Sequence, residues 1–336
     1  PKVQSIKMTL YRAGGDSAII RSLIRAAERG VQVAVLVELK ARFDEANNVQ
    51  WARQLERAGV HVVYGMVGLK THSKVALVVR DDGDELRRYV HIGTGNYNAK
   101  TARIYEDLGV LTCSPDIGDD ATQLFNHLTG YSRSEDYRNL LVAPRDLRRQ
   151  LVDLIEHEAS FGADGHIVLK CNSIADDELI ETLYAASAAG TRIDMIVRGI
   201  CCLRAGVPGM SETIRVRSIL GRYLEHSRIY RFAHGNVVHG ERLPTATSDA
   251  VFLIGSADLM PRNLNRRVEV MVPIEHPRHT AALDQALEFA LADDIVAWEL
   301  QPDDTWTRVG PTNSFEPHSQ ERMYRWMVRQ QLAGRP

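Results

Sequence analysis

The stretch GLKTHSKVALVV, residues 68–79, places three polar residues directly before an apolar run. The run VALVV has the β-branched and apolar composition of a buried strand. His72, Ser73 and Lys74 stand at the point where that strand would begin. Polar residues often end a loop in this way, so the stretch alone does not distinguish a functional site from an ordinary loop. The surrounding sequence has to decide between these two interpretations.

Strand and helix patterns alternate around this stretch. SIKMTLYR predicts a strand, and Asp16 or Ser17 can cap the helix SAIIRSLIRAAERG, which Gly30 ends. VQVAVLVEL predicts a strand that is buried on both faces. NNVQWARQLERAG predicts a second helix, VHVVYGMV a further strand, and SKVALVVR and RRYVHIGTG two strands joined by the turn sequence DDGDE. This order is typical of an α/β fold.

The second half of the chain repeats this order. DSAIIRSLIRAAERGVQVAVLVELKARF, from Asp16, corresponds to DDELIETLYAASAAGTRIDMIVRGICCL, from Asp176. Later, HSKVALVV corresponds to HSRIYRF, and YVHIGTGNYNAKTARIYEDLGVL corresponds to VFLIGSADLMPRNLNRRVEVMVP. Three matches in the same order indicate an internal duplication. We therefore expect one domain at residues 1–150, a second at 151–300, and a tail at 301–336 made of a loop and a peripheral helix.

The duplication gives His72 a counterpart, because His226 and Arg228 repeat the order of His72 and Lys74. Residues two apart on a strand point to the same face, so each histidine shares a side with its cation. If the halves pack about a pseudo-twofold axis, two imidazoles and two cations meet in one cleft. One imidazole could then attack phosphorus while the other carries protons, and the cations would offset the phosphate charge.

Composition narrows the remaining possibilities. A length of 336 residues favours two domains, and a formal net charge of −2 gives no overall attraction to nucleic acid, which we do not expect as a partner. The four cysteines have neither metal-ligand nor disulfide spacing, as is typical of a reducing compartment. No apolar run reaches the length of a membrane span. Four histidines in loop-like sequence are expected to be exposed to solvent: His234, His239, His276 and His279.

The repeated H-x-K or H-x-R sequence, followed each time by I-G-T or I-G-S, resembles the phospholipase D superfamily. Two features depart from that pattern: Val79 stands where the superfamily has Asp, and Arg228 replaces the second Lys. Both departures, and the stretches KMTLYR, ELKARFDEANN, GLKTHSK, HIGTGNYNAKTARIYED, VRGICCL and RYLEHSRIY, are similar to polyphosphate kinase. The resemblance covers nearly all of residues 1–300 and only the C-terminal half of that enzyme. We therefore expect this chain to be part of a longer protein.

This resemblance implies a fold and an activity. The fold would be α/β, with two tandem phospholipase D-like domains related by internal duplication and a catalytic cleft between them. The reaction would move the terminal phosphate of ATP onto polyphosphate, reversibly, through a phosphohistidine. His72 corresponds to the nucleophile of the family. His226 corresponds to its second essential histidine, which contacts the nucleotide and can donate or accept a proton.

Four further positions follow from the same resemblance. Tyr105 and Arg198 correspond to positions that contact ATP, whereas Arg12 and Arg42 correspond to positions that the family associates with Mg²⁺, the expected cofactor. Because a cation does not ligate a cation, we interpret both arginines as contacts to the phosphate oxygens that hold the metal. Each of the three arginines follows a predicted strand, and ligands gather at such carboxyl ends in α/β sheets.

The remaining polar candidates are less specific. Lys74 and Arg228 are expected to contact phosphate. Asn96 could hold an imidazole or bind phosphate, although the asparagines of GTGNYN equally suit a turn. Glu106 and Glu269 could orient the histidines or form ordinary ion pairs.

Two other functions compete with the kinase interpretation. The first is a phosphodiesterase of the phospholipase D type, against which the missing Asp and the absence of a basic net charge argue. The second is a polyanion-binding module without turnover, against which the retention of both histidines argues. For the kinase we expect ATP, ADP and inorganic polyphosphate as partners and a homo-oligomer of the full-length enzyme. We expect a cytoplasmic protein, with possible association with a membrane.

Overall fold

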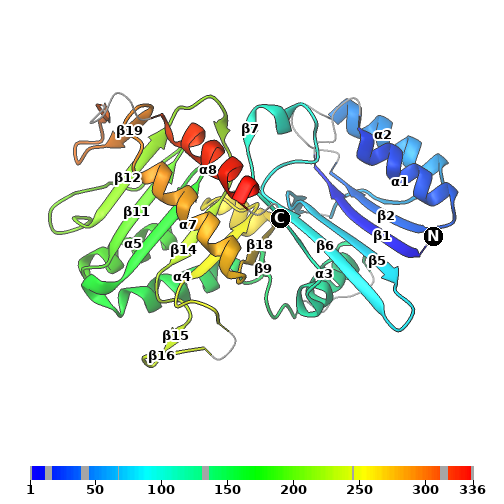
Figure 1. The fold of residues 1–336 in the computed structure, drawn as a ribbon, viewed down its shortest axis with the longest axis horizontal. Helices are drawn as coiled ribbons and strands as arrows, with labels where there is room; N and C mark the ends of the chain where they lie inside the picture. The colour runs from blue at the N-terminus through cyan, green and yellow to red at the C-terminus, as the bar shows by residue number, and fades with distance from the viewer. Residues whose placement is uncertain are drawn as a thin grey trace. The chain divides into compact units, whose positions relative to one another are not determined.

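The computed structural model of the chain describes residues 2–11, 17–38, 45–66, 68–130, 136–243, 246–310 and 317–333. The chain forms two compact units, and Figure 1 labels many of their elements. The first unit comprises Pro1–Leu147, Ile254–Ala257 and Pro261–Val272. The second comprises Arg148–Leu253, Asp258–Met260 and Pro273–Pro336.

The first unit is built on a six-stranded sheet with the order β3-β2-β1-β5-β6-β8. Its strands are β1 (Val3–Leu10), β2 (Gln32–Val37), β3 (His61–Val63), β5 (Val75–Asp81), β6 (Leu86–Gly93) and β8 (Gly109–Thr112). β1, β2 and β3 are parallel, whereas β5 is antiparallel to both β1 and β6. The strand–helix–strand segments thus form the parallel half, and the predicted hairpin begins the antiparallel half.

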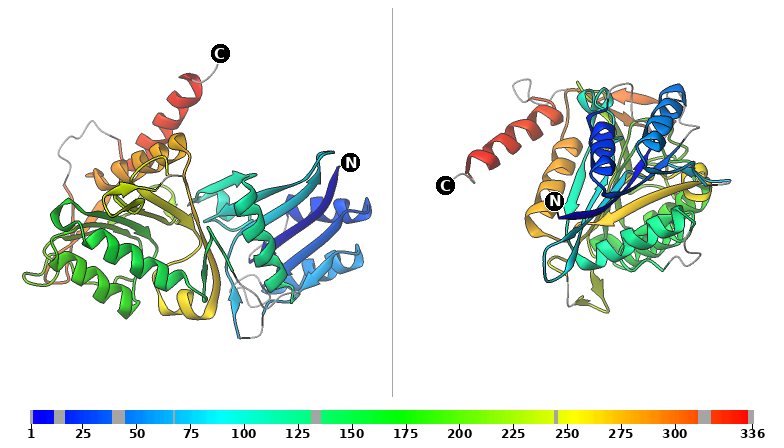
Figure 2. Two further views of the ribbon diagram at one scale, coloured as in Figure 1. Left: turned by 90° about the horizontal axis from the view of Figure 1, so that it is seen from below. Right: turned by 90° about the vertical axis from the view of Figure 1, so that its right-hand side faces the viewer.

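Helices cover both faces of this sheet (Figure 2). They are α1 (Ala18–Glu28), α2 (Glu45–Arg57) and α3 (Pro115–Leu128). Met8 of β1 belongs to the core beneath α1 and α2, whereas Lys7 reaches Asn126 of α3, and neighbouring residues of a strand point to opposite faces. α1 begins as predicted, because the Ser17 hydroxyl accepts a hydrogen bond from the Ile20 N–H.

Short elements complete the first unit. They are β4 (Lys70–Thr71), β7 (Tyr105–Glu106), β9 (Leu141–Ala143), α6 (Pro261–Arg266) and β18 (Arg267–Pro273). β18 runs parallel to β4 and antiparallel to β9. Thr71 therefore lies opposite Val268, although nearly two hundred residues of chain separate the two.

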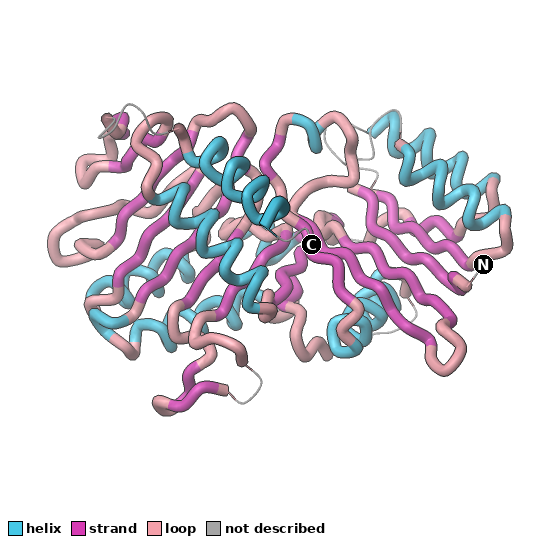
Figure 3. Tube along the Cα trace, in the orientation of Figure 1, coloured by secondary structure: helices cyan, strands magenta, loops and turns pink. Residues whose placement is uncertain are grey.

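The second unit repeats the arrangement of the first. Figure 3 draws the strands of the chain in magenta. The sheet of the second unit includes the order β20-β19-β12-β11-β10-β14-β17. These strands are β10 (His166–Cys171), β11 (Arg192–Val197), β12 (Ile214–Ile219), β14 (Ile229–Phe232), β17 (Val251–Gly255), β19 (Ala297–Leu300) and β20 (Trp306–Arg308). The path β12-β11-β10-β14-β17 has the same order as β3-β2-β1-β5-β6, and its first four strands run in the same relative directions as β3, β2, β1 and β5. The predicted duplication is confirmed.

The helices of the second unit also form two layers (Figure 2). α4 (Leu147–Ala159) and α5 (Asp177–Ala188) lie on one face of the sheet, and α7 (Pro277–Leu291) and α8 (Ser319–Ala333) lie on the other. The remaining short strands are β13 (Leu224–Glu225), β15 (Val237–Val238) and β16 (Glu241–Arg242). Among the described residues, no helix is long and apolar enough to cross a membrane.

Candidate active site

His72 lies between the end of β4 and the start of β5, where the sequence predicted the beginning of a strand. The backbone N–H groups of His72 and Ser73 both donate to the Val268 carbonyl, at 3.0 Å. The Ser73 carbonyl accepts from the Thr9 hydroxyl at 2.8 Å. Backbone contacts to β18 and β1 thus fix the position of this histidine before its side chain makes any contact.

The imidazole of His72 is held by Glu269. Its Nδ1 lies 2.9 Å from both carboxylate oxygens, and His72 is only 8% exposed while Glu269 is fully buried. The same carboxylate accepts from the Ser256 hydroxyl and from the Asn263 amide. Because an ionised carboxylate can only accept, Nδ1 is the donor in this pair, and Nε2 is the ring nitrogen that Glu269 does not hold.

Tyr11 and Lys74 pack beside this imidazole. The rings of Tyr11 and His72 meet edge to face with centroids 4.7 Å apart, and the Lys74 ammonium lies 5.5 Å from the centre of the same tyrosine ring. The ammonium also donates to the carbonyl of His72, and Lys74 is 1% exposed. Lys74 therefore stabilises the histidine segment from inside the unit.

The GTGNYN loop behaves as a turn at Asn98 but not at Asn96. The Asn98 side chain accepts from the N–H groups of Lys100 and Thr101, which caps the turn that follows. The Oδ1 of Asn96 is buried and has no hydrogen-bond partner among the described residues. A buried acceptor without a partner, such as this oxygen of Asn96, often marks a place where water or a ligand binds.

Tyr105, in β7, is partly buried.

The second histidine repeats the backbone arrangement of the first. Arg228 donates to the His226 carbonyl at 2.8 Å, as Lys74 donates to that of His72. The guanidinium also forms a two-pronged pair with Asp258, at 3.1 and 3.0 Å, and is 2% exposed. The alignment of the repeats places Asp258 where the first half has Asn96. The two copies therefore share their geometry and differ in charge.

A buried polar network holds the segment before His226. Lys170 donates to the Ser227 hydroxyl and pairs with Glu225, both at 2.7 Å. Gln320, at the start of α8, donates to Glu225 at 2.6 Å and exchanges hydrogen bonds with the backbone of Tyr223. The C-terminal helix thus contacts the strand that leads directly into the second histidine.

The predicted arginines are only partly described by the structure. Arg198 follows β11 directly, at the carboxyl end of the strand as predicted, and is partly buried. Arg12 and Arg42 lie outside the described residues. Within the described ranges, no three His, Cys, Asp or Glu side chains cluster in a way that could hold a metal ion. The described side chains therefore offer no protein cage for Mg²⁺.

Sequence reasoning missed Asp258, Glu225, Lys170 and Gln320. Asp258 had one available signal, since it replaces Asn96 beside the Lys-to-Arg change in the repeat. The second copy thus has a larger cation, Arg228, paired with the carboxylate of Asp258. The other three residues belong to no motif, and only the folded chain brings them together.

Comparisons with known proteins identify the family. Residues 1–134 match the family model "Polyphosphate kinase C-terminal domain 1", and residues 140–320 match "Polyphosphate kinase C-terminal domain 2". A polyphosphate kinase of Synechocystis sp. is 56% identical over 327 residues, which is 96% of this chain and 43% of the relative. One of Mycobacterium avium is 56% identical over 310 residues, 91% of this chain and 40% of the relative. The chain spans less than half the length of these curated relatives.

Solved structures agree with this assignment. The crystal structure of polyphosphate kinase from Porphyromonas gingivalis has a TM-score of 0.86 and 36% identity, covering 99% of this chain and 50% of that one. That of a phosphatidylserine synthase from Haemophilus influenzae has a TM-score of 0.60 at 11% identity over 98% of this chain and 89% of that one, which shows a shared fold alone. The predicted fold class is confirmed. The chain belongs to the polyphosphate kinase family.

Proposed function

We propose that this chain carries the phosphoryl-transfer chemistry of a polyphosphate kinase, with His72 as the nucleophile. The observation that carries the proposal is the buried pair of His72 and Glu269, in which the carboxylate contacts Nδ1, so that Nε2 is the nitrogen proposed to attack. The 56% identity to polyphosphate kinases supports the substrate class, ATP and inorganic polyphosphate.

The proposed reaction has two displacements. Nε2 of His72 attacks the γ-phosphorus of ATP, a P–N bond forms, and the bond to the bridging oxygen breaks so that ADP leaves. A terminal oxygen of polyphosphate then attacks the same phosphorus, and the P–N bond breaks. Glu269 stabilises the positive charge that develops on the imidazole when Nε2 bonds to phosphorus. Every step is reversible, so ADP can recover phosphate from polyphosphate.

The other predicted residues have supporting roles in this proposal. His226 contacts the nucleotide and carries a proton, Tyr105 and Arg198 contact ATP, and Asn96 contributes a buried acceptor toward bound water or ligand. Lys74 and Arg228 lie against the histidine carbonyls, so we propose that they position the histidines. Lys74 would also add positive charge behind His72, whereas Asp258 offsets the charge of Arg228.

Mg²⁺ is proposed as the cofactor, bound through phosphate oxygens. Mg²⁺ is commonly held by substrate phosphates with few protein ligands, which suits a chain whose described residues form no metal cluster. When bound there, it would offset negative charge on the transferring phosphate. Arg12 and Arg42 are proposed to contact the same phosphate oxygens. The cytoplasmic location, membrane association and homo-oligomer expected from the resemblance also stay predictions, which cell fractionation and sedimentation of the full-length protein can check.

Replacing the nucleophile tests the proposal directly. The protein is incubated with γ-labelled ATP or with labelled polyphosphate, and acid-labile phosphate is mapped to peptides. Label is expected on His72 in the unmodified protein and should be lost in His72→Ala. His239→Ala, at an exposed loop position, is the matched control and should keep it.

Three results would contradict the proposal. One is label at an unchanged level in His72→Ala, and another is label on His226 in place of His72. The third is hydrolysis of a phosphodiester substrate without any phosphoenzyme, which would favour the phosphodiesterase alternative. Full-length protein containing this chain is assayed in parallel, because a chain covering 43% of a relative can lack residues that bind ATP.

A further inference from the structure

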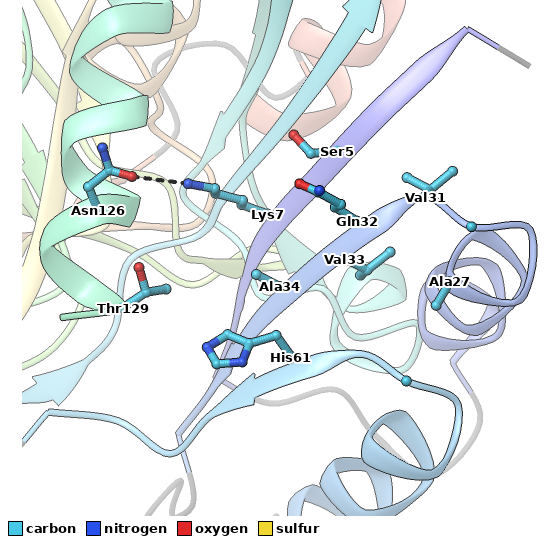
Figure 4. A pocket seen from close by; sticks show the side chains of 12 residues that line it. Ser5, Lys7, Ala27, Val31, Gln32, Val33, Ala34, His61, Asn126 and Thr129 are labelled. Atoms are coloured by element: carbon cyan, nitrogen blue, oxygen red, sulfur yellow. Dashed lines mark hydrogen bonds between the residues drawn. The ribbon is translucent and has the colours of Figure 1, made fainter. Parts of the chain in front are cut away.

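A polar hollow of about 860 Å³ lies in the first unit, at the amino ends of β2 and β3 (Figure 4). His72 lies beyond the carboxyl end of neighbouring strands, so the hollow is separate from the candidate nucleophile. The hollow is lined on one side by Ala27, Val31 and Val33, which lie toward α1, and on the other by the sheet face of Lys7, Ala34 and His61, with Asn126 and Thr129 at the C-terminal end of α3. The volume falls in the range of small-molecule sites and exceeds what a single oxyanion needs.

Strand register explains how the hollow forms. Lys7, Ala34 and His61 are direct neighbours on β1, β2 and β3. Adjacent strands lie about 4.8 Å apart, so the backbones of Lys7 and His61 are about 10 Å apart, with only a methyl group between them. Ser5 and Gln32 form the next pair along the strands and add polar side chains. Because Ala34 is small and lies between Lys7 and His61, it leaves space that their polar side chains line.

The charge balance of this hollow is one-sided. None of its lining residues is Asp or Glu. The Lys7 ammonium donates to the neutral Asn126 carbonyl oxygen at 3.1 Å, and within the described part of the chain it forms no ion pair with a carboxylate. Burial lowers the pKa of Lys7 from its ordinary value. A partly buried ammonium with a neutral partner is stabilised when an anion arrives, since the anion supplies the missing counter-charge.

We propose that this hollow is a second anion site, which binds the phosphate chain of a ligand through Lys7. The ligand class is a phosphate chain, either free inorganic polyphosphate or the chain of a nucleoside triphosphate. Gln32, Thr129 and His61 supply further hydrogen-bond donors around the same space. The inference is independent of the phosphoryl transfer proposed for His72, because it rests on a different edge of the sheet.

Lysine labelling reports on this site directly. Pyridoxal 5′-phosphate carries an aldehyde that condenses with a lysine amine to an imine and water, and borohydride traps the product for peptide mapping. Tripolyphosphate is expected to protect Lys7 from this label, whereas sodium chloride at equal ionic strength should not. Equal labelling of Lys7 with and without saturating tripolyphosphate would overturn the proposal. A parallel series with ATP identifies the source, since the form that protects at lower concentration is the preferred ligand.

A change of one atom in the partner of Lys7 separates binding from folding. Asn126→Asp places a carboxylate beside the ammonium, so the ion pair should preserve thermal stability while it neutralises the site. The tripolyphosphate concentration for half protection should rise about tenfold or more, which matches the loss of one charge-assisted contact. Gln331→Glu adds the same charge at an exposed position of α8 and should leave protection unchanged. Undiminished protection in Asn126→Asp would contradict the role of Lys7.

Discussion

At the scale of single residues, Glu269 holds the Nδ1 nitrogen of the His72 ring. It accepts from the Nδ1 of His72 and also from Ser256 and Asn263, so its carboxylate has little freedom to turn. An anion with no solvent exposure is costly unless several donors satisfy it. The donors around Glu269 offset this cost of burial, and a carboxylate that is shielded from water is a stronger hydrogen-bond acceptor.

Glu269→Gln should slow phosphohistidine formation by about tenfold to a hundredfold. The amide oxygen can still accept from Nδ1, but the hydrogen bond loses its charge assistance, worth roughly 1.5–3 kcal/mol, at 1.4 kcal/mol for each tenfold. Single-turnover labelling with ATP measures the rate, and ATP affinity should change much less. Glu241→Gln, at an exposed position, is the control. A normal rate in Glu269→Gln would mean that the pair is structural.

The sequence predicted both histidines and named Glu269 as a candidate to orient them, without deciding its role. His72 and His226 belong to a repeated motif, and the motif alone indicated nucleophilic chemistry. For Glu269 the sequence left two roles open, orienting a histidine or forming an ordinary ion pair. Its contact to His72 requires β18 to pair with β4 across nearly two hundred residues of chain, which the sequence does not reveal. Asp258 was missed because its only signal is a difference between the repeats, Asp at the position of Asn96.

At the scale of elements, the C-terminal helix does more than the sequence suggested. α8 was expected to be peripheral, and its outward residues Tyr324 and Leu332 are indeed exposed. Its first turn, however, is fixed by a hydrogen bond from the Ser319 N–H to Asp293 and by the contacts of Gln320. A glutamine in an amphipathic helix gives no sign of such a role, so only the three-dimensional contact reveals it.

Gln320→Ala should loosen the strand that leads into His226. The change removes hydrogen bonds to Tyr223 and leaves Glu225 with one donor fewer, which should lower the free energy of unfolding by about 1–3 kcal/mol. Amide exchange should rise in residues 221–228 while the core strand β11 keeps its protection. Gln331→Ala, on the exposed end of the same helix, should change neither. Unaltered exchange in residues 221–228 would show that α8 does not support this segment.

One of the four loop histidines was misjudged from the sequence. His276, His239 and His279 are exposed as expected, but His234 is half-buried. Its Nδ1 lies 2.9 Å from Glu158 of α4, and its ring stacks on Phe161. Glu158 is fully buried and also accepts from the backbone N–H groups of His166 and His234. Composition predicts that loops are solvated, whereas a buried carboxylate nearby can recruit a loop histidine as its donor.

At the scale of the whole molecule, the repeat in the sequence and the grouping of contacts divide the chain differently. The repeat predicts domains at 1–150 and 151–300, with each histidine among its own neighbours. By contacts, Ile254–Ala257 and Pro261–Val272 group with the first unit. These two segments carry Ser256, Asn263 and Glu269. The sequence could predict the succession of strands and helices along each copy, because local patterns encode it. It could not predict that the segments completing the His72 environment come from the second repeat.

A fragment of residues 1–147 should therefore fail to form a competent His72 site. It retains the six-stranded sheet but lacks β18, so β4 and β9 lose their pairing partner and His72 loses its carboxylate acceptor. We expect a lower unfolding temperature than that of the intact chain and no phosphohistidine, as measured by thermal unfolding and by labelling with γ-labelled ATP.

The matched comparison is the intact chain carrying Glu269→Ala. That variant keeps β18, and its backbone still accepts from His72 and Ser73 through Val268. It should unfold at a higher temperature than the fragment, and it should label far more slowly than the unmodified chain. If the fragment 1–147 were labelled at His72 as fast as the intact chain, the segment 254–272 would be dispensable. The assignment of Glu269 as the group that orients the nucleophile would then be wrong.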